Sequence, residues 1–216
     1  MKARSEPARI GFVIYEGVEP IDVGGTAGVV SMARRVLPDI SCVMIAERTG
    51  PVRLAGDVTV IADADFQNAP PCDVFIVCGG PGWREQVGNP AMLAFLRSRR
   101  RNEVASVCTG ALILAAAGTL DGLRATTRRA AVGIETDSPL SLISRYAKDA
   151  IPQENLVVED QGVVTSGGVS LAIDGTLYLI GRIYGEQARD DLAKVIEYDR
   201  AFEANAQALG IYPAPA

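Results

Sequence analysis

The chain has 216 residues, of which 48% are hydrophobic and 22% charged, a balance typical of a folded globular domain. Its net charge of −5 disfavours nucleic-acid binding, which needs a concentrated positive surface, and we interpret the basic run at residues 97–101 as a solvated helix end. The absence of histidine excludes Ser-His and Cys-His nucleophile pairs and His-rich zinc sites, so we expect no metal and no other cofactor.

Short apolar runs alternate with helical patterns along the whole chain. In chain order we expect a strand at 9–15, a helix at 21–37, a strand at 40–46, a hairpin at 52–61, a strand at 72–77, a helix at 90–101 capped by Asn89, a strand at 104–107, helices at 109–117 and 138–146, a strand at 162–165, and helices at 170–184 and 187–209. This alternation predicts an α/β fold with a mostly parallel central sheet and helices on both faces. No linker or repeat interrupts it, so we expect one domain over residues 1–216.

The four cysteines, at positions 42, 72, 78 and 108, form no C-x-x-C motif, which excludes a zinc ribbon and a thioredoxin-like pair. We interpret Cys42 and Cys72 as structural and Cys78 as a small buried hydrophobe, with a resolving thiol as the alternative for Cys78. No signal peptide is readable, and no apolar stretch approaches the ~20 residues that span a bilayer. We therefore expect a cytoplasmic protein with reduced thiols and no membrane contact.

Unusual residues follow several of the expected strands, at the sheet edge where parallel folds bind ligands. They are a loop with three carboxylates at residues 16–22, a glycine-rich run at 78–82, a cysteine followed by small residues at 108–111, and a Ser-Gly-Gly-Val run at 166–169. The glycine-rich run lacks a following Gly-Lys-Ser/Thr and has no Rossmann spacing, which disfavours nucleotide binding.

Cys108 lies where the strand at 104–107 turns directly into a small-residue helix. Gly110 and Ala111 leave room for such a sharp turn, as in a nucleophile elbow with Cys in place of Ser. A thiol at a helix N-terminus is expected to have a lowered pKa, because the helix dipole favours the thiolate. The alternative is a buried core cysteine, but the strand-to-helix position favours a nucleophile.

Several motifs occur in a consistent order: residues 21–25, 73–82, 106–111, 115–120, 124–127, 165–169 and 173–174. On these motifs the chain resembles the ThiJ/PfpI superfamily of flavodoxin-like proteins, with a core at about residues 8–200. Within it, the resemblance is to the isonitrile hydratase branch.

This resemblance implies that Cys108 is the nucleophile, that Asp22 is the carboxylate near its sulfur, and that Thr109 is a further site residue. It also implies a small-molecule substrate and a homodimer. The pocket for substrate or oxyanion would include Gly79, Gly80, Val169 and Arg128, with backbone amides at its wall.

Two positions depart from the family pattern. Arg128 stands where relatives often have histidine, and it could signal an anionic ligand. Thr26 stands where relatives usually have proline, and we expect it to alter only the local backbone.

The function implied is hydration of an isocyanide to an N-substituted formamide through a Cys108 thioimidate, with Asp22 as proton donor and water activator. Asp22 has a second interpretation as the N-cap of the helix at 21–37, and Glu16 and Glu19 are rival carboxylates. Two other functions remain open. One is a ligand- or oxidation-sensing protein without a DNA-binding module, and the other is a glyoxalase- or deglycase-like enzyme.

Overall fold

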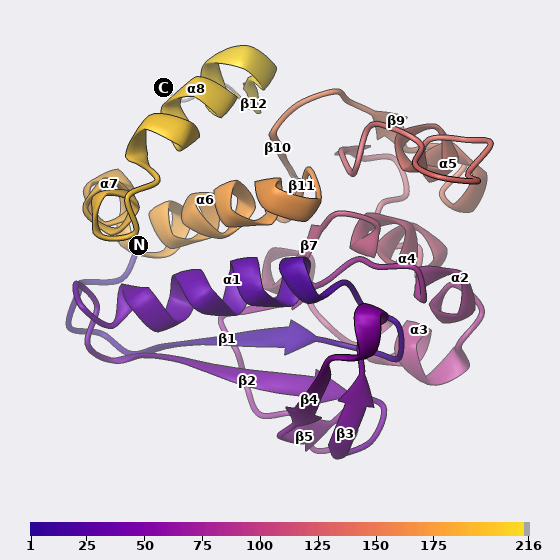
Figure 1. Cartoon of the computed structure of the whole chain (residues 1–216), viewed down its shortest axis with the longest axis horizontal. Helices are drawn as coiled ribbons and strands as arrows, with labels where there is room; N and C mark the ends of the chain where they lie inside the picture. Colours follow the sequence, from indigo (N-terminus) through magenta and orange to yellow (C-terminus); the bar gives the residue numbers. More distant parts are fainter. Residues whose placement is uncertain (214–216) are drawn as a thin grey trace.

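The computed structural model describes residues 1–213, which form a central sheet flanked by helices (Figure 1). Across the sheet, in spatial order, lie β12 (Ile211–Tyr212), β10 (Val157–Asp160), β11 (Val163–Ser166), β7 (Val104–Val107), β6 (Val74–Val77), β1 (Ala8–Val13), β2 (Ile40–Ala46) and β5 (Ala64–Asp65). All neighbours are parallel except β10 and β11, which confirms the prediction of a mostly parallel sheet.

The middle of the sheet is buried because its strands are apolar on both faces. Every residue of β6 and β7 is buried, and so are five of the six residues of β1. Two smaller two-stranded sheets accompany the central one. They are the predicted hairpin of β3 (Gly50–Arg53) and β4 (Thr59–Ala62), and the pair of β8 (Arg124–Ala125) and β9 (Ile151–Pro152).

The helices follow the predicted order, with local signals at several of their ends. Asn89 caps α3 by accepting hydrogen bonds from the amides of Ala91 and Met92, and Ser138 caps α5 in the same way. The helix α1 packs beside α6 in front of the sheet, whereas α4 packs against β6 and β7 (Figure 1). Their bounds are α1 (Pro20–Ala33), α2 (Trp83–Gln86), α3 (Pro90–Arg97), α4 (Gly110–Ala116), α5 (Pro139–Tyr146), α6 (Ala172–Tyr184), α7 (Glu186–Val195) and α8 (Asp199–Leu209).

The prediction of one helix at 187–209 is wrong, because the structure has α7 and α8 there. The break occurs at Glu197, whose φ of +55° is incompatible with a continuing right-handed helix. It also allows the Tyr198 hydroxyl to donate to Asp174 of α6. The helix predicted to run to residue 101 ends at Arg97, and the short strands β10 and β12 were not predicted.

None of the helices in the described residues combines the length and apolar composition that a membrane span requires. Within residues 1–213, no cluster of three or more His, Cys, Asp or Glu side chains is arranged to hold a metal ion.

Candidate active site

Cys108 occupies a tight corner between β7 and α4. Its φ is +51°, a conformation that a non-glycine residue adopts rarely and that a surrounding structure must enforce. Here the Cys108 amide donates to the Gly167 carbonyl at 3.1 Å, and the Cys108 carbonyl accepts a hydrogen bond from the Thr127 hydroxyl. The side chain is only 3% exposed. The expected sharp strand-to-helix turn is therefore present, with the thiol held inside it.

Two glycines allow neighbouring loops to close around this corner. A Cβ at Gly168 would collide with the sulfur of Cys108, so only glycine fits beside the thiol. Gly80 has a φ of +142°, and a Cβ there would collide with the backbone of Glu19. The glycine-rich runs that the sequence placed at the sheet edge thus serve close packing around Cys108.

Asp22 is completely buried beside this corner. One carboxylate oxygen accepts a hydrogen bond from the Gly79 amide at 2.9 Å, and the other accepts one from the Val169 amide at 3.1 Å. The N-cap position of α1 belongs to Glu19, and Asp22 is the third residue of the helix. The capping interpretation of Asp22 is therefore wrong, and its carboxylate instead joins α1 to the loops after β6 and β11.

Burial raises the pKa of both groups at this corner. The pKa of Asp22 rises to about 6 through burial, opposed by the neighbouring Cys108 thiol and the Gly79 and Val169 amides. Burial, and then the negative charge of Asp22, raise the pKa of the Cys108 thiol to about 12. The expectation of a lowered thiol pKa is thus wrong, because these effects outweigh the Thr109 and Val169 amides. At neutral pH the proton of the pair resides on sulfur and the carboxylate is largely ionised.

Thr109 joins the elbow to the glycine-rich loop. Its hydroxyl oxygen accepts a hydrogen bond from the Gly80 amide at 2.9 Å. The amides of Gly79, Gly80 and Val169 are consequently occupied, two by Asp22 and one by Thr109. They position the side chains of the site and are not free donors for an oxyanion.

A cavity of about 180 Å³ opens onto Cys108. Of the residues expected at the pocket, Gly80, Thr109, Val169 and Arg128 line it, whereas Gly79 lies behind, bonded to Asp22. Glu19, a rival carboxylate in the sequence, and Pro81 of the glycine-rich run also line it. Sequence reasoning did not identify the other lining residues as parts of the site, because no local pattern marks loop residues that only the fold brings together. They are Trp83, Arg84, Val132 and Glu135.

Arg128 is paired inside this cavity. One of its guanidinium nitrogens donates to both carboxylate oxygens of Glu135 at 2.8 Å, and both side chains are 14% exposed. Burial raises the pKa of Glu135, but the hydrogen bonds from Arg128, the Val132 amide and Arg84, together with the positive charge of Arg128, outweigh it and the pKa is lowered. The positive charge that could have signalled an anionic ligand is therefore neutralised by the chain itself.

Of the two rival carboxylates, Glu19 lines the Cys108 cavity, whereas Glu16 lies outside it. Glu16 is exposed and accepts hydrogen bonds from the Arg53 amide at 3.2 Å. Cys78 is fully buried, with its sulfur 4.0 Å from the Thr26 hydroxyl, and burial raises its pKa far above the ordinary value. This placement agrees with the interpretation of Cys78 as a small buried hydrophobe.

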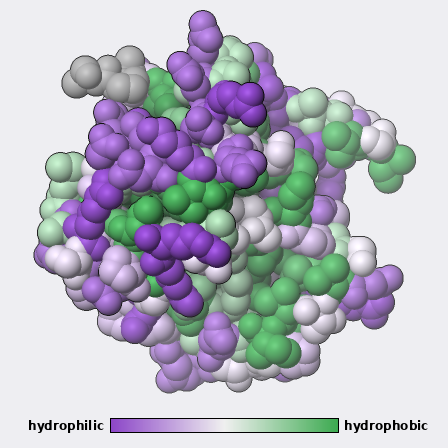
Figure 2. Space-filling model, turned by 60° about the vertical axis from the view of Figure 1, so that its left-hand side comes forward, coloured by the Kyte–Doolittle hydropathy of each residue, from purple (hydrophilic) through white to green (hydrophobic). Residues whose placement is uncertain are grey.

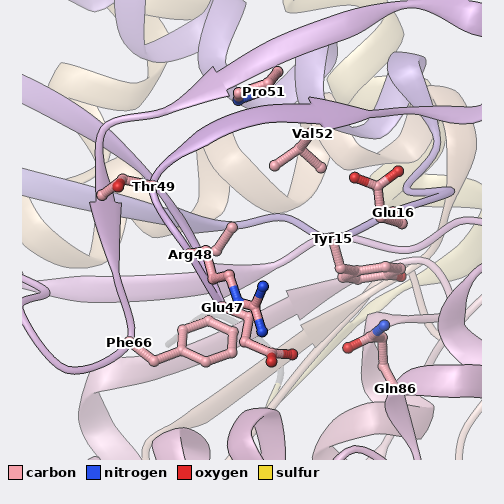
Figure 3. A pocket seen from close by; sticks show the side chains of 10 residues that line it. Tyr15, Glu16, Glu47, Arg48, Thr49, Pro51, Val52, Phe66 and Gln86 are labelled. Atoms are coloured by element: carbon pink, nitrogen blue, oxygen red, sulfur yellow. The ribbon is translucent and has the colours of Figure 1, made fainter.

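A second, wider cavity of about 400 Å³ lies at the ends of β1 and β2. Figure 3 shows Tyr15, Glu47, Arg48 and Phe66 around it, together with Gln86 of α2. Its lining contains no cysteine, so of these two cavities only the smaller one contains a thiol.

Comparison with known proteins agrees with this arrangement. The profile of the DJ-1/PfpI family matches residues 8–180. The chain belongs to the DJ-1/PfpI family. Among solved structures, this DJ-1/PfpI protein is similar to a ThiJ/PfpI family protein from Pseudomonas syringae, with 25% identity, a TM-score of 0.78, and coverage of 90% of this chain and 76% of the other. It shares its fold with Drosophila melanogaster DJ-1beta, at 18% identity and a TM-score of 0.72, over 89% of this chain and 98% of that one.

Two curated relatives of this DJ-1/PfpI chain have named roles. It is 31% identical to isonitrile hydratase from Pseudomonas putida over 192 residues, which are 88% of this chain and 78% of the relative. It is 30% identical to the HTH-type transcriptional regulator GbdR of Pseudomonas aeruginosa over 143 residues, which are 65% of this chain but 36% of the regulator.

Proposed function

We propose that this DJ-1/PfpI protein is an isonitrile hydratase-like enzyme, a lyase that adds water to a small uncharged isocyanide. The observation that carries the proposal is the buried pair of Asp22 and Cys108 at the end of a small cavity. The similarity to the isonitrile hydratase of Pseudomonas putida supports the same reaction. Both reacting groups are of the kinds that a histidine-free chain must use.

The carbon of an isocyanide accepts both a nucleophile and a proton, which is what this pair supplies. Asp22, ionised at neutral pH, takes the thiol proton as the sulfur of Cys108 bonds to the isocyanide carbon. It then delivers that proton to the same carbon, which completes a thioimidate, R–N=CH–S–Cys. The raised pKa of the thiol is no obstacle, because the thiolate forms only as its bond to carbon forms.

Water completes the reaction. Asp22 removes a proton from water as its oxygen attacks the thioimidate carbon, and delivers that proton to the nitrogen. The carboxylate then takes the remaining proton from the hydroxyl as the carbonyl forms and the carbon–sulfur bond breaks, and passes it to the departing sulfur of Cys108. The products are R–NH–CHO and the regenerated Cys108 thiol. A carboxyl with a pKa of about 6 is suited to this exchange, because it both accepts and donates a proton near neutral pH.

The direct test is incubation of the protein with an uncharged alkyl isocyanide, with formamide measured by mass spectrometry and the mass of Cys108 peptides followed in parallel. Formamide production that Cys108→Ser abolishes is the expected result. Methylglyoxal and hydrogen peroxide are tested alongside. Lactate from methylglyoxal without formamide would instead favour a glyoxalase-like enzyme.

A sensing function is the second candidate, and the similarity to part of the regulator GbdR favours it. Its signature would be saturable binding or oxidation of Cys108 by a compound that the protein does not turn over.

The expected homodimer also belongs to this proposal. The surface carries hydrophobic side chains among hydrophilic ones (Figure 2), and Ile21, Val58 and Ile61 are exposed. Light scattering at micromolar concentration should give twice the mass of one chain. We propose a cytoplasmic location as well, which fractionation of cells would test.

A further inference from the structure

The loop after β8 brings charges to the mouth of the Cys108 cavity. The two hydrogen bonds from one Arg128 nitrogen to the Glu135 carboxylate connect the start of this loop to its end. The Val132 amide donates to the same carboxylate at 2.9 Å, which holds the middle of the loop over the cavity. Arg84 of α2 approaches Glu135 at 3.5 Å, with its guanidinium 4.8 Å from the centre of the Trp83 ring. The Glu135 carboxylate thus contacts two guanidinium groups and one backbone amide.

The charges that line the cavity balance. Two acids, Glu19 and Glu135, face two bases, Arg84 and Arg128. Behind the thiol, Asp22 is ionised at neutral pH. Arg128 is near enough for its positive charge to lower the pKa of the Cys108 thiol, yet its guanidinium is directed to Glu135. An anionic substrate would therefore lose its hydration without gaining an unpaired cation, and the ionised carboxylate would repel it. An uncharged substrate is subject to neither effect.

We propose that Glu135 determines the charge specificity of the site, by occupying Arg128 so that the Cys108 cavity accepts uncharged substrates and excludes anionic ones. This inference deepens the proposed function, since it names the substrate class of the same site. Removing the charge of Glu135 leaves Arg128 and Arg84 with one acid, Glu19, so that the lining gains one positive charge. Arg128 is then free to bind a carboxylate at the mouth of the cavity.

The test uses two alkylating reagents of similar size, uncharged iodoacetamide and anionic iodoacetate, because their reaction with Cys108 does not depend on any hydratase activity. Mass spectrometry of peptides gives the rate at Cys108, and the partly buried Cys42, which lies outside the cavity, is the internal reference. In Glu135→Gln, the iodoacetate-to-iodoacetamide rate ratio at Cys108 should rise about tenfold over the wild type, the equivalent of about 1.4 kcal/mol.

Three variants separate charge from loop position. Glu135→Asp keeps the charge and should retain the wild-type ratio. Arg128→Gln should not raise the ratio, and the double variant Glu135→Gln/Arg128→Gln should lose most of the gain. An equal acceleration of both reagents in Glu135→Gln, which a merely opened loop would give, overturns the proposal. So does a gain that persists in the double variant.

The hydratase substrates give a parallel readout. In Glu135→Gln, turnover of isocyanoacetate relative to its uncharged methyl ester should rise in the same direction as the alkylation ratio. If the wild-type protein hydrates neither compound, the proposed function fails. The alkylation ratios still decide whether Glu135 determines the access of anionic compounds to Cys108.

Discussion

Two buried aspartates occupy equivalent positions in two different helices. Asp22 is the third residue of α1 and Asp174 the third residue of α6, and neither is exposed to solvent. Burial raises the pKa of each to about 6. Burial and a perturbed pKa therefore do not distinguish a reactive carboxylate from a structural one in this molecule.

Their partners do distinguish them. Asp174 accepts hydrogen bonds from the Tyr198 hydroxyl at 2.9 Å and from the Asn205 amide at 3.2 Å, which connect α6 to α8 and the segment before it. Asp22 bonds to backbone amides, which supply no proton under ordinary conditions, and the side chain that hydrogen-bonds to it is the Cys108 thiol. Asp22 is thus placed to exchange a proton with a nucleophile, while Asp174 is enclosed by groups that stabilise packing.

Removal of the thiol should have the largest effect on the site. Cys108→Ala is expected to abolish turnover and to leave the fold intact, because the corner already accommodates a small side chain. Formamide production and the melting temperature are measured on one preparation. Turnover in Cys108→Ala close to that of the wild type would contradict a nucleophilic role, whatever the state of the other cysteines.

The two aspartates can be compared directly by replacing each with asparagine. Asp22→Asn should reduce turnover by about 10²–10⁴, because the amide cannot exchange a proton with Cys108 or water. Asp174→Asn is the matched control and should keep turnover near the wild-type value, with a lower melting temperature. Equal losses of activity in the two variants would mean that both carboxylates act through folding alone.

Several strands, a helix cap and the two reactive residues could be predicted from the sequence, whereas the contacts around Asp22 depend on long-range packing. The strands at 40–46 and 104–107 and the Asn89 cap were predicted correctly because β-branched runs and capping signals act locally. Cys108 and Asp22 were identified by motif, and they do lie together. The amides that donate to the Asp22 carboxylate come from residues 57 and 147 positions away, so a helix-capping interpretation was equally open.

Other features had no local signal. Glu135 was not identified, because only the folded loop brings it to Arg128. The break between α7 and α8 depends on the contact of Tyr198 with Asp174 in another helix. The direction of the thiol pKa was predicted wrongly because the helix terminus is visible in the sequence, whereas the burial of Cys108 is not.

The structural aspartate gives a prediction on stability. Tyr198→Phe removes one donor from the buried Asp174 carboxylate and should lower the free energy of unfolding by about 1–3 kcal/mol, with turnover unchanged. Denaturant unfolding measures the loss. Because the Asn205 amide still donates to Asp174, unfolding should remain cooperative. A variant as stable as the wild type would show that this contact contributes nothing to holding α8.

The pH dependence of stability follows from both aspartates. Each carboxyl has a pKa near the ordinary aspartate value of 3.8 when unfolded and of about 6 when folded. Between these values the folded protein binds more protons than the unfolded one, so its stability should fall as pH rises through this window. Asp174→Asn should reduce the slope and leave the part due to Asp22. Unfolding free energies measured from pH 4 to pH 7 would contradict this if they rose steadily.

The smallest predicted effect is on the pKa of the Cys108 thiol, and it again compares the two aspartates. The negative charge of Asp22 is one cause of the raised pKa of Cys108, after burial. Asp22→Asn should therefore lower that pKa, although burial keeps it above the ordinary value, and Asp174→Asn should leave it unchanged. The ultraviolet absorbance of the thiolate is titrated against pH, and the curve of the Cys108→Ser variant is subtracted to remove the other three cysteines and the tyrosines. A pKa of Cys108 that is the same in Asp22→Asn and in the wild type would mean that the carboxylate and the thiol do not share a proton, and the mechanism proposed for the pair would lose its first step.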